Sequence, residues 1–481
     1  MDSSVVLKIF EQITRIPRES GHEDGIRAWL TEWAESHSLE HRQDAAGNLL
    51  IRREAAPGKE NVPVLVLQSH LDMVCEKNAG VEHDFARDPI RYEIRDGWMV
   101  APDTTLGADD GIGIAASLAL LEDNTPTGAL ECLFTASEET GMDGAMGLEP
   151  GFFEGKTLVN LDSEDEGQLF VGCAGGLNTN IRFRVFRSAL KCGYEPVGLM
   201  VGGGQGGHSG DDINKGRVNT VQQMARFLYA HLSECQVLSI TGGGKPNAIA
   251  RECSAIVAVP DIKAFASEVE KFSASLKEQF HKTDPEVFCR ILARGEYDAA
   301  AAILPRPALS DSSALAVVRS LYTCPHGMQA MSQDIDGLVQ TSTNLASVRM
   351  IGRGVVEVVT SQRSSSTAER RDIAARVAAN FESEGAVTAK KYEYPGWNPD
   401  MSSPILARTV EAYRRLFSQE PEVKAIHAGL ECGLFAEKIG GLDMISFGPT
   451  LRGVHAPGER LELASLDKFV ALLYDIVVNF N

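Results

Sequence analysis

Hydrophobic and polar positions in residues 1–180 follow two different periods. Apolar side chains recur every three to four positions over 3–17 and 23–39, which predicts two amphipathic helices. The segment "GADDGIGIAASLALLED" (107–123) begins as a loop and continues as a helix of small and apolar residues, which predicts a buried helix. Short apolar runs predict buried strands at 47–53, 62–70, 128–136 and 156–161. This order of strands and helices favours an α/β fold with buried strands.

The pattern changes at about Val171, where strands are separated by glycine-rich turns such as "VGGGQGGHSG" and "TGGGKPNAIA". Helical periodicity between these strands, for example over 216–232 and 262–280, indicates an α+β region. After "YPGWNPDMSSP" the α/β alternation resumes. The simplest architecture is therefore an α/β domain built from residues 1–180 and 396–481, with an α+β domain of residues 181–395 inserted in it.

The composition narrows the cellular setting and the partners. The 481 residues carry a formal charge of -20, which argues against nucleic acid or an anionic membrane as the main partner. The first twenty residues have an acidic start and charges within their apolar stretch, unlike a signal peptide, and no apolar run is long enough to cross a bilayer. The nine cysteines form no CxxC pair, which predicts buried thiols in a reducing compartment. We therefore predict a cytoplasmic protein.

Polar clusters follow the apolar runs at five places: "SHLDM", "GADDG", "ASEETG", "NLDSED" and, near the end of the chain, "GVHAPGE". In an α/β sheet the strand ends and the loops beyond them form the usual ligand crevice. Imidazoles and carboxylates are good ligands for zinc, manganese or cobalt. Two metal ions need about five protein ligands with one bridging carboxylate, and the clusters offer such a set: His70, Asp109, Glu139, Asp162 and His455.

Two carboxylates are left for other roles. Adjacent residues at a strand end point to different places, so Glu139 is free to bind metal while Glu138 stays unbound as a general base. Because side chains alternate along a strand, Asp72 and His70 lie on one side, and Asp72 is suited to hold the imidazole in one tautomer. Each cluster alone also fits a plain turn or a solvated loop. Their occurrence in series, each after an apolar strand, favours a single site.

The series "SHLDMV", "TLGADDGIG", "FTASEETGMDGA", "NLDSED", "GGHSG" and "HAGLECG…GVHAPGE" resembles the cocatalytic-zinc amidohydrolases of the peptidase T, peptidase V and aminoacylase group. The forms "GADDGIG", "SEETGMDGA" and "GVHAPGERL" resemble its dipeptidase branch. The resemblance covers essentially the whole chain. It implies a zinc-peptidase catalytic domain in which Asp109 bridges two zinc ions and is joined to Asp110 by a cis peptide bond. His70 and Asp162 would complete one metal site, and Glu139 and His455 the other.

The resemblance also implies that the inserted domain is a lid that contributes substrate-binding residues. His208 in "GGHSG" would stabilise the oxyanion of the scissile carbonyl. Asn247 in "GKPNAIA" would contact the substrate, and Arg363 in "SQRSS" would hold its C-terminal carboxylate. Gly429 in "HAGLECG" would offer backbone near the substrate. A plain alternative for His208 is an exposed side chain in a glycine-rich hairpin. Both a monomer and a homodimer, with His208 serving its own or a neighbouring site, fit the sequence.

The sequence thus predicts hydrolysis of dipeptides with broad specificity, including Xaa-His, by a water that bridges two zinc ions, with cobalt or manganese as substitutes. Glu138 would be the general base and Asp72 the orienting acid. One alternative is an N-acyl amino acid amidohydrolase of the same group, which needs no free α-amine. An alternative of another class is a nucleotide-binding protein that uses "VGGGQGGHSG" as a phosphate loop, although such a loop is expected after the first strand of a βαβ unit.

Overall fold

The computed structural model describes residues 1–293, 295–296 and 307–481. The chain divides into two compact units. The first unit comprises Met1–Gly172, Trp397–Ala425 and Leu430–Asn481, and the second comprises Cys173–Gly396 and Ile426–Gly429. The boundaries predicted from the sequence, 180/181 and 395/396, assign the short segment Ile426–Gly429 to the first domain, whereas in the structure this segment groups with the second unit.

Among the described residues, the first unit contains nearly all of an eight-stranded mixed sheet. Its strands follow the order β1-β2-β6-β3-β7-β21-β8-β20. In chain order its strands are β1 (Glu40–Gln43), β2 (Leu49–Arg53), β3 (Leu65–His70), β6 (Leu130–Thr135), β7 (Thr157–Asn160), β8 (Gln168–Cys173), β20 (Glu422–Ile426) and β21 (Asp443–Ser446). Strands β6, β3, β7 and β21 run parallel to their neighbours in that order. Their carboxyl ends therefore share one edge of the sheet.

Helices surround this sheet, and a small second sheet follows the order β22-β23-β5-β4. The helices are α1 (Ser3–Ile13), α2 (Asp24–Ser36), α3 (Ala108–Glu122), α4 (Glu138–Gly141), α5 (Asp143–Gly147), α11 (Pro404–Phe417), α12 (Glu431–Lys438) and α13 (Leu463–Asn479). The short strands are β4 (Glu93–Arg95), β5 (Trp98–Val100), β22 (Leu451–Arg452) and β23 (Arg460–Glu462).

Two of these helices illustrate how the apolar pattern determines packing. In α1 the buried residues are spaced by three or four positions, so one face of the helix is covered, as predicted; they are Val6, Ile9, Phe10 and Ile13. In α3 every residue from Ala108 to Leu121 is buried, which confirms the predicted buried helix. The backbone of α3 departs from helical angles at Asp109 and Asp110, and the peptide bond between these two residues is cis, as predicted.

The second unit contains a nine-stranded antiparallel sheet, counted over the described residues, in which β14-β11-β13-β12-β17-β18-β9-β19 follow one another and β16 pairs with β17. Its strands are β9 (Gly175–Arg184), β11 (Glu195–Gly202), β12 (Gln236–Gly243), β13 (Cys253–Val259), β14 (Phe288–Ile291), β16 (Gly327–Met331), β17 (Val339–Ile351), β18 (Val355–Ser364) and β19 (Val387–Tyr394). A short pair, β10 (Arg187–Ser188) and β15 (Ala308–Leu309), lies beside it.

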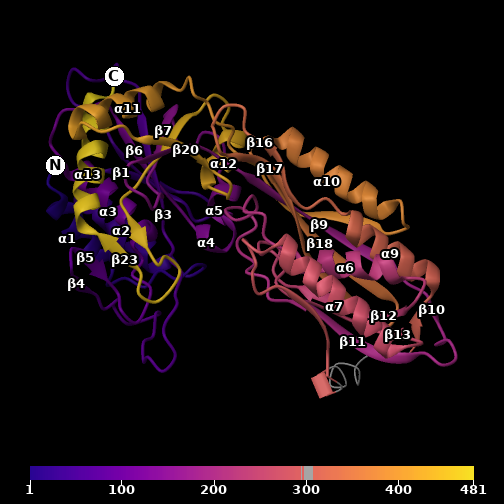
Figure 1. Cartoon of the computed structure of the whole chain (residues 1–481). Coiled ribbons are helices and arrows are strands. Elements are labelled where there is room, and N and C mark those ends of the chain that lie inside the picture. The colour runs from indigo at the N-terminus through magenta and orange to yellow at the C-terminus, as the bar shows by residue number, and fades with distance from the viewer. Residues whose placement is uncertain (294, 297–306) are drawn as a thin grey trace. The chain divides into compact units, whose positions relative to one another are not determined.

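Helices α6 (Thr220–His231), α7 (Ile262–Gln279), α9 (Asp311–Thr323) and α10 (Thr367–Glu382) lie along this sheet (Figure 1). Alternate strand residues, for example Val197, Leu199 and Val201 of β11, join the core beneath the helices. One face of the sheet is therefore covered, and the α/β plus α+β fold class is as predicted. Within the described part of the chain, the helices are all too short or too polar to cross a membrane. Seven of the nine cysteines are buried.

Candidate metal centre

The predicted metal ligands follow the carboxyl ends of the parallel strands in the first unit. His70 is the last residue of β3, Glu139 lies just beyond β6, and Asp162 just beyond β7. His455 lies in the loop between β22 and β23, after β21. Asp109 stands at the start of α3. Since parallel strands end at one edge of a sheet, residues far apart in the sequence meet there.

The side chains of these residues converge. His70 Nε2 lies 2.9 Å from Asp109 Oδ1 and 3.7 Å from Asp162 Oδ1. His455 Nε2 lies 3.1 Å from Asp109 Oδ2 and 2.9 Å from Glu139 Oε1. The two oxygens of Asp109 thus face different imidazoles, which is the arrangement expected of a bridging carboxylate.

Among the described residues, the ligand atoms of His70, Asp109 and Asp162 lie within 4.8 Å of one another, and so do those of Asp109, Glu139 and His455. These two groups share Asp109 and coincide with the two predicted metal sites. The grouping supports the predicted pairing, which stays a prediction. A third group within the same distance consists of His70, Glu138 and Glu139.

Asp72 connects His70 to the glutamate pair. Its Oδ1 lies 3.4 Å from His70 Nδ1 and accepts the Glu138 N–H at 3.0 Å, while its Oδ2 accepts the Glu139 N–H at 3.2 Å. The Ser20 hydroxyl also donates to Oδ2. Burial alone would raise the pKa of Asp72, but the hydrogen bond and charge of His70, with the bond from Ser20, lower it to about 2. Asp72 is therefore an anion that lies beside His70 and accepts the first two N–H groups of α4.

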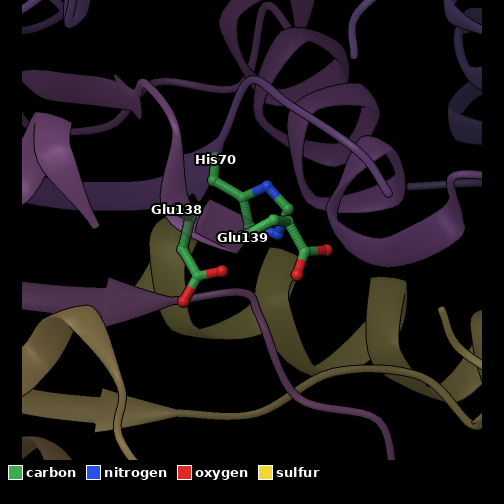
Figure 2. A group of neighbouring side chains, drawn as sticks. All are labelled: His70, Glu138 and Glu139. Carbon is green, nitrogen blue, oxygen red and sulfur yellow. The ribbon is translucent and has the colours of Figure 1, made fainter. Parts of the chain in front are cut away.

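Glu138 and Glu139 point to different sides, as the sequence analysis anticipated (Figure 2). The carboxylate of Glu139 contacts His455 Nε2 at 2.9 Å, and Figure 2 shows the carboxylate of Glu138 directed to another side. Burial raises the pKa of Glu138 to about 7. The negative charges of Glu139 and Asp109 also raise this pKa, whereas the charge of His70 lowers it. A carboxylate with a pKa near neutrality is suited to accept and release a proton.

The charges of the site are those expected around a bound cation. Burial raises the pKa of Asp162 well above its usual value, and the neighbouring Asp109 raises it further. The hydrogen bonds to Asp109 and Glu139 raise the pKa of His455 to about 10. The carboxylates and imidazoles thus lie close enough to share one positive centre. A nitrogen and oxygen donor set with excess negative charge fits divalent zinc, cobalt or manganese.

A buried polar network beneath the centre was not anticipated. Glu431 at the start of α12 is buried, and its Oε2 accepts from Gln68 Nε2 at 2.6 Å and from the Thr135 hydroxyl at 2.7 Å. Asn160 donates to Gln68 at 2.6 Å. The network ties β3, β6, β7 and α12 together below the ligands. The available signal was a polar residue inside each apolar run, as in "LVLQSH" and "LVN".

The four predicted substrate residues all lie in the second unit, and three of them, His208, Arg363 and Gly429, are linked through two other side chains. His208 Nδ1 lies 3.2 Å from Asp211 Oδ2, and the Ser209 N–H donates to the Asn247 carbonyl at 2.8 Å. The hydrogen bond from His208, together with the charge of Arg363, lowers the pKa of Asp211.

Tyr394 provides the second link. Arg363 Nη1 donates to the Tyr394 hydroxyl at 3.3 Å. A Cβ atom placed on Gly429 would lie 2.9 Å from Tyr394 Cε2, so the ring packs closely over that glycine. Another histidine that the sequence analysis passed over, His427, places its Nε2 2.7 Å from the hydroxyl of Ser342. The sequence around Tyr394, His427 and Ser342 has no hydrophobic or polar pattern that would have identified these residues as part of a site.

The glycine cluster of "VGGGQGGHSG" does not have the structure of a phosphate loop. It follows β11, which has antiparallel neighbours, and leads into turns before α6 begins at Thr220. His208 instead forms an isolated β-bridge with Ala248. The nucleotide-binding alternative lacks the βα geometry on which it depends.

A family comparison agrees with the fold and the centre. The model of Peptidase family M20/M25/M40 matches residues 66–479. The chain belongs to this family, which makes it a hydrolase of the metallopeptidase class and confirms the resemblance noted in the sequence.

Individual relatives cover nearly the whole chain. The cytosol non-specific dipeptidase of Escherichia coli (strain K12) is 37% identical over 480 residues, which cover 98% of this chain and 96% of the relative. The crystal structure of aminoacylhistidine dipeptidase from Vibrio alginolyticus superimposes with a TM-score of 0.90 at 34% identity and covers 99% of this chain and 97% of its own. The aminopeptidase PepT of Bacillus cereus, at 16% identity and a TM-score of 0.59 over 99% and 98% of the two chains, shares the fold.

Proposed function

We propose that this protein is a cytosolic dipeptidase of broad specificity whose substrates include Xaa-His. It would use two divalent metal ions, with zinc as the preferred metal. The observation that carries the proposal is the pair of ligand groups that share Asp109. The relatives support it further, because one is named a cytosol non-specific dipeptidase and the other an aminoacylhistidine dipeptidase.

Five residues would hold the metal ions: His70 and Asp162 on one side, Glu139 and His455 on the other, and Asp109 between them. Bound divalent metal supplies Lewis acidity, which polarises a carbonyl and makes water a stronger acid. Cobalt and manganese accept the same nitrogen and oxygen ligands and are expected to replace zinc.

Glu138 would be the general base. It is half-buried, its backbone N–H donates to Asp72 Oδ1, and it would take a proton from water and deliver it to the leaving amine. Asp72 remains ionised and keeps His70 oriented, so it acts through its neighbours rather than on the substrate.

The second unit would recognise the substrate and act as a lid. His208 would donate a hydrogen bond to the developing oxyanion, and Asp211, whose Oδ2 lies 3.2 Å from His208 Nδ1, would hold the imidazole in place. Arg363 would hold the free C-terminal carboxylate, while Asn247 and Gly429 would contact the peptide between them. Charged groups at both ends of the substrate would restrict its length more than its side chains.

A reconstitution experiment tests this proposal. The protein is stripped of metal with a chelator and then supplied separately with zinc, manganese or cobalt. Each form is assayed on Ala-His, on a tripeptide and on N-acetyl-Ala-His. Metal-dependent cleavage of Ala-His alone supports the proposal. Cleavage of the acetylated compound would instead assign the protein as an N-acyl amino acid amidohydrolase, and activity without any metal would refute the metal centre.

A further inference from the structure

Glu459 binds four consecutive backbone N–H groups with one carboxylate. Its Oε2 accepts from Leu106 at 2.7 Å and from Gly107 at 3.0 Å, and its Oε1 accepts from Ala108 at 2.8 Å and from Asp109 at 3.4 Å. The Glu459 side chain is almost fully buried, with 2% exposed. This single acid thus fixes the backbone of the loop that presents Asp109.

Arg18 binds the carbonyl side of the same region. Its Nη2 donates to the Gly107 carbonyl, and its Nη1 donates to the carbonyls of Leu71 at 3.1 Å and Asp72 at 2.6 Å. Arg18 is also buried. The guanidinium therefore ties the loop that leads to Asp109 to the loop that follows His70.

The surroundings leave Arg18 little freedom. A Cβ atom placed on Gly107, whose φ is +71°, would lie 2.6 Å from Arg18 Nη2 and 2.7 Å from Met73 Sδ. A Cβ atom placed on Gly111 would also lie 2.6 Å from Arg18 Nη2. Both glycines are needed so that the backbone can approach the guanidinium. The loop at Gly107 is enclosed between Arg18 on its carbonyl side and Glu459 on its amide side.

Burying two charges is an expensive way to fill space. An apolar pair of similar volume often stabilises a fold equally well or better, because charged groups lose their hydration on burial. What the charges add here is direction, since each one holds several backbone dipoles in a set orientation. The residues so held adjoin His70 and Asp109, which would each bind metal.

We propose that Glu459 and Arg18 are positioning residues that hold the His70 and Asp109 loops in their metal-binding arrangement before metal arrives. The inference deepens the proposed function and rests on the metal centre assigned there. It also explains why "GVHAPGE" joins two functions: His455 would bind metal directly, and Glu459, four residues later, would set the loop of another ligand.

Hydrogen exchange on the metal-free wild-type protein tests preorganisation without any substitution. If Glu459 holds the N–H groups of residues 106–109 before metal binds, these groups are already protected in the metal-free protein. Zinc should then change their exchange rates by less than about threefold. Free exchange in the metal-free protein, with protection appearing only on addition of zinc, would overturn the proposal.

Substitutions test the link to metal affinity. Glu459→Gln replaces one acceptor oxygen by a donor that faces two N–H groups, and Arg18→Lys retains the charge but loses the planar fork. Zinc affinity of the folded protein, measured by competition with a chromophoric chelator, should fall about 10–100-fold in Glu459→Gln. Arg18→Lys should also weaken zinc binding. The exposed Glu437→Gln on α12 and Arg91→Lys are matched controls that should bind zinc like the wild type.

A purely structural role has a different outcome. It would lower the melting temperature of the metal-free protein and leave the zinc affinity of the folded protein unchanged, and that result would overturn the proposal. If Glu459→Gln does not fold, the shorter Glu459→Asp, which keeps the charge, decides by the same measurement. Failure of the wild type itself to bind zinc would refute the proposed metal centre, whereas normal zinc binding by folded variants would refute only the positioning role.

Discussion

Replacing Gly429 by alanine tests whether Tyr394 positions the arginine that would bind the substrate carboxylate. The new Cβ would lie 2.9 Å from Tyr394 Cε2 and 3.4 Å from Cζ and Oη, so the ring must shift. The opposite glycine allows little relief, because a Cβ at Gly176 would lie 2.4 Å from Tyr394 Cε1 and the ring already packs against that backbone. The displaced ring loses its 3.3 Å hydrogen bond to Arg363.

The size of the effect follows from that bond. A hydrogen bond to a charged group contributes about 1.5–3 kcal/mol, and the length of this one places it at the lower end. Since 1.4 kcal/mol corresponds to a factor of ten, kcat/KM for a free dipeptide should fall roughly tenfold, through KM. Tyr394→Phe keeps the ring and removes only the hydroxyl, so it should produce a similar loss.

The assay compares Ala-His with its C-terminal amide on the zinc-loaded enzyme. Tyr394→Phe should lose activity on Ala-His and match the wild type on the amide, which has no carboxylate for Arg363 to hold. Gly429→Ala should lose more activity on Ala-His than on the amide. Tyr392→Phe, two residues earlier on β19 and exposed, is the matched control and should change neither. Equal losses on both substrates, or no loss in Tyr394→Phe, would refute the reasoning.

Two further predictions concern a proton acceptor and a partly buried histidine, His326. Glu138→Gln should retain its zinc, determined by metal analysis, while kcat falls about 10²–10⁴-fold; full activity would mean that another group is the base. Burial lowers the pKa of His326 to about 4, and its Nδ1 accepts the Leu345 N–H at 3.3 Å. Above pH 6.5 the ring is neutral in both the folded and the unfolded protein. Between pH 6.5 and 4 the unfolded chain binds more protons than the folded protein, so the free energy of unfolding falls as pH falls. Urea unfolding at pH 7 and pH 5 should show a loss of about 2 kcal/mol from this group, absent in His326→Asn; an identical pH dependence in the variant would contradict the assignment.

The elements that frame the centre were predictable because their pattern is simple. An apolar run that ends in a polar cluster marks a buried strand and its loop, and β3, β6 and β7 each show it. The hydrophobic pattern does not reveal the order of the strands within the sheet, however, and the sequence alone did not place β21 beside β7. His455 was a candidate ligand from its polar cluster, whereas the substrate residues were identified through family resemblance rather than through periodicity.

The residues that escaped sequence analysis share a physical reason. Arg18 and Glu459 are charged, and a charged residue in a chain is normally assigned to the surface. Their partners are backbone groups, whose directions depend on the folded loops and are not written in side-chain type. Tyr394 lies on the edge strand β19, most of whose residues are exposed. Its contact with Gly429 depends on a separate segment, Ile426–Gly429, which belongs to the second unit but comes later in the sequence.

The return of the chain to its first unit has a consequence for biosynthesis. Asp109 and His455 are 346 residues apart. At about 5–20 residues per second, a ribosome needs roughly 20–70 s to cover that span. During this time Cys173–Gly396 is made as one continuous stretch, while β7 still lacks its neighbour β21. The inserted stretch can fold before the first unit is complete, and the proposed hydrolytic centre stays open on the nascent chain until its last ligand has been added.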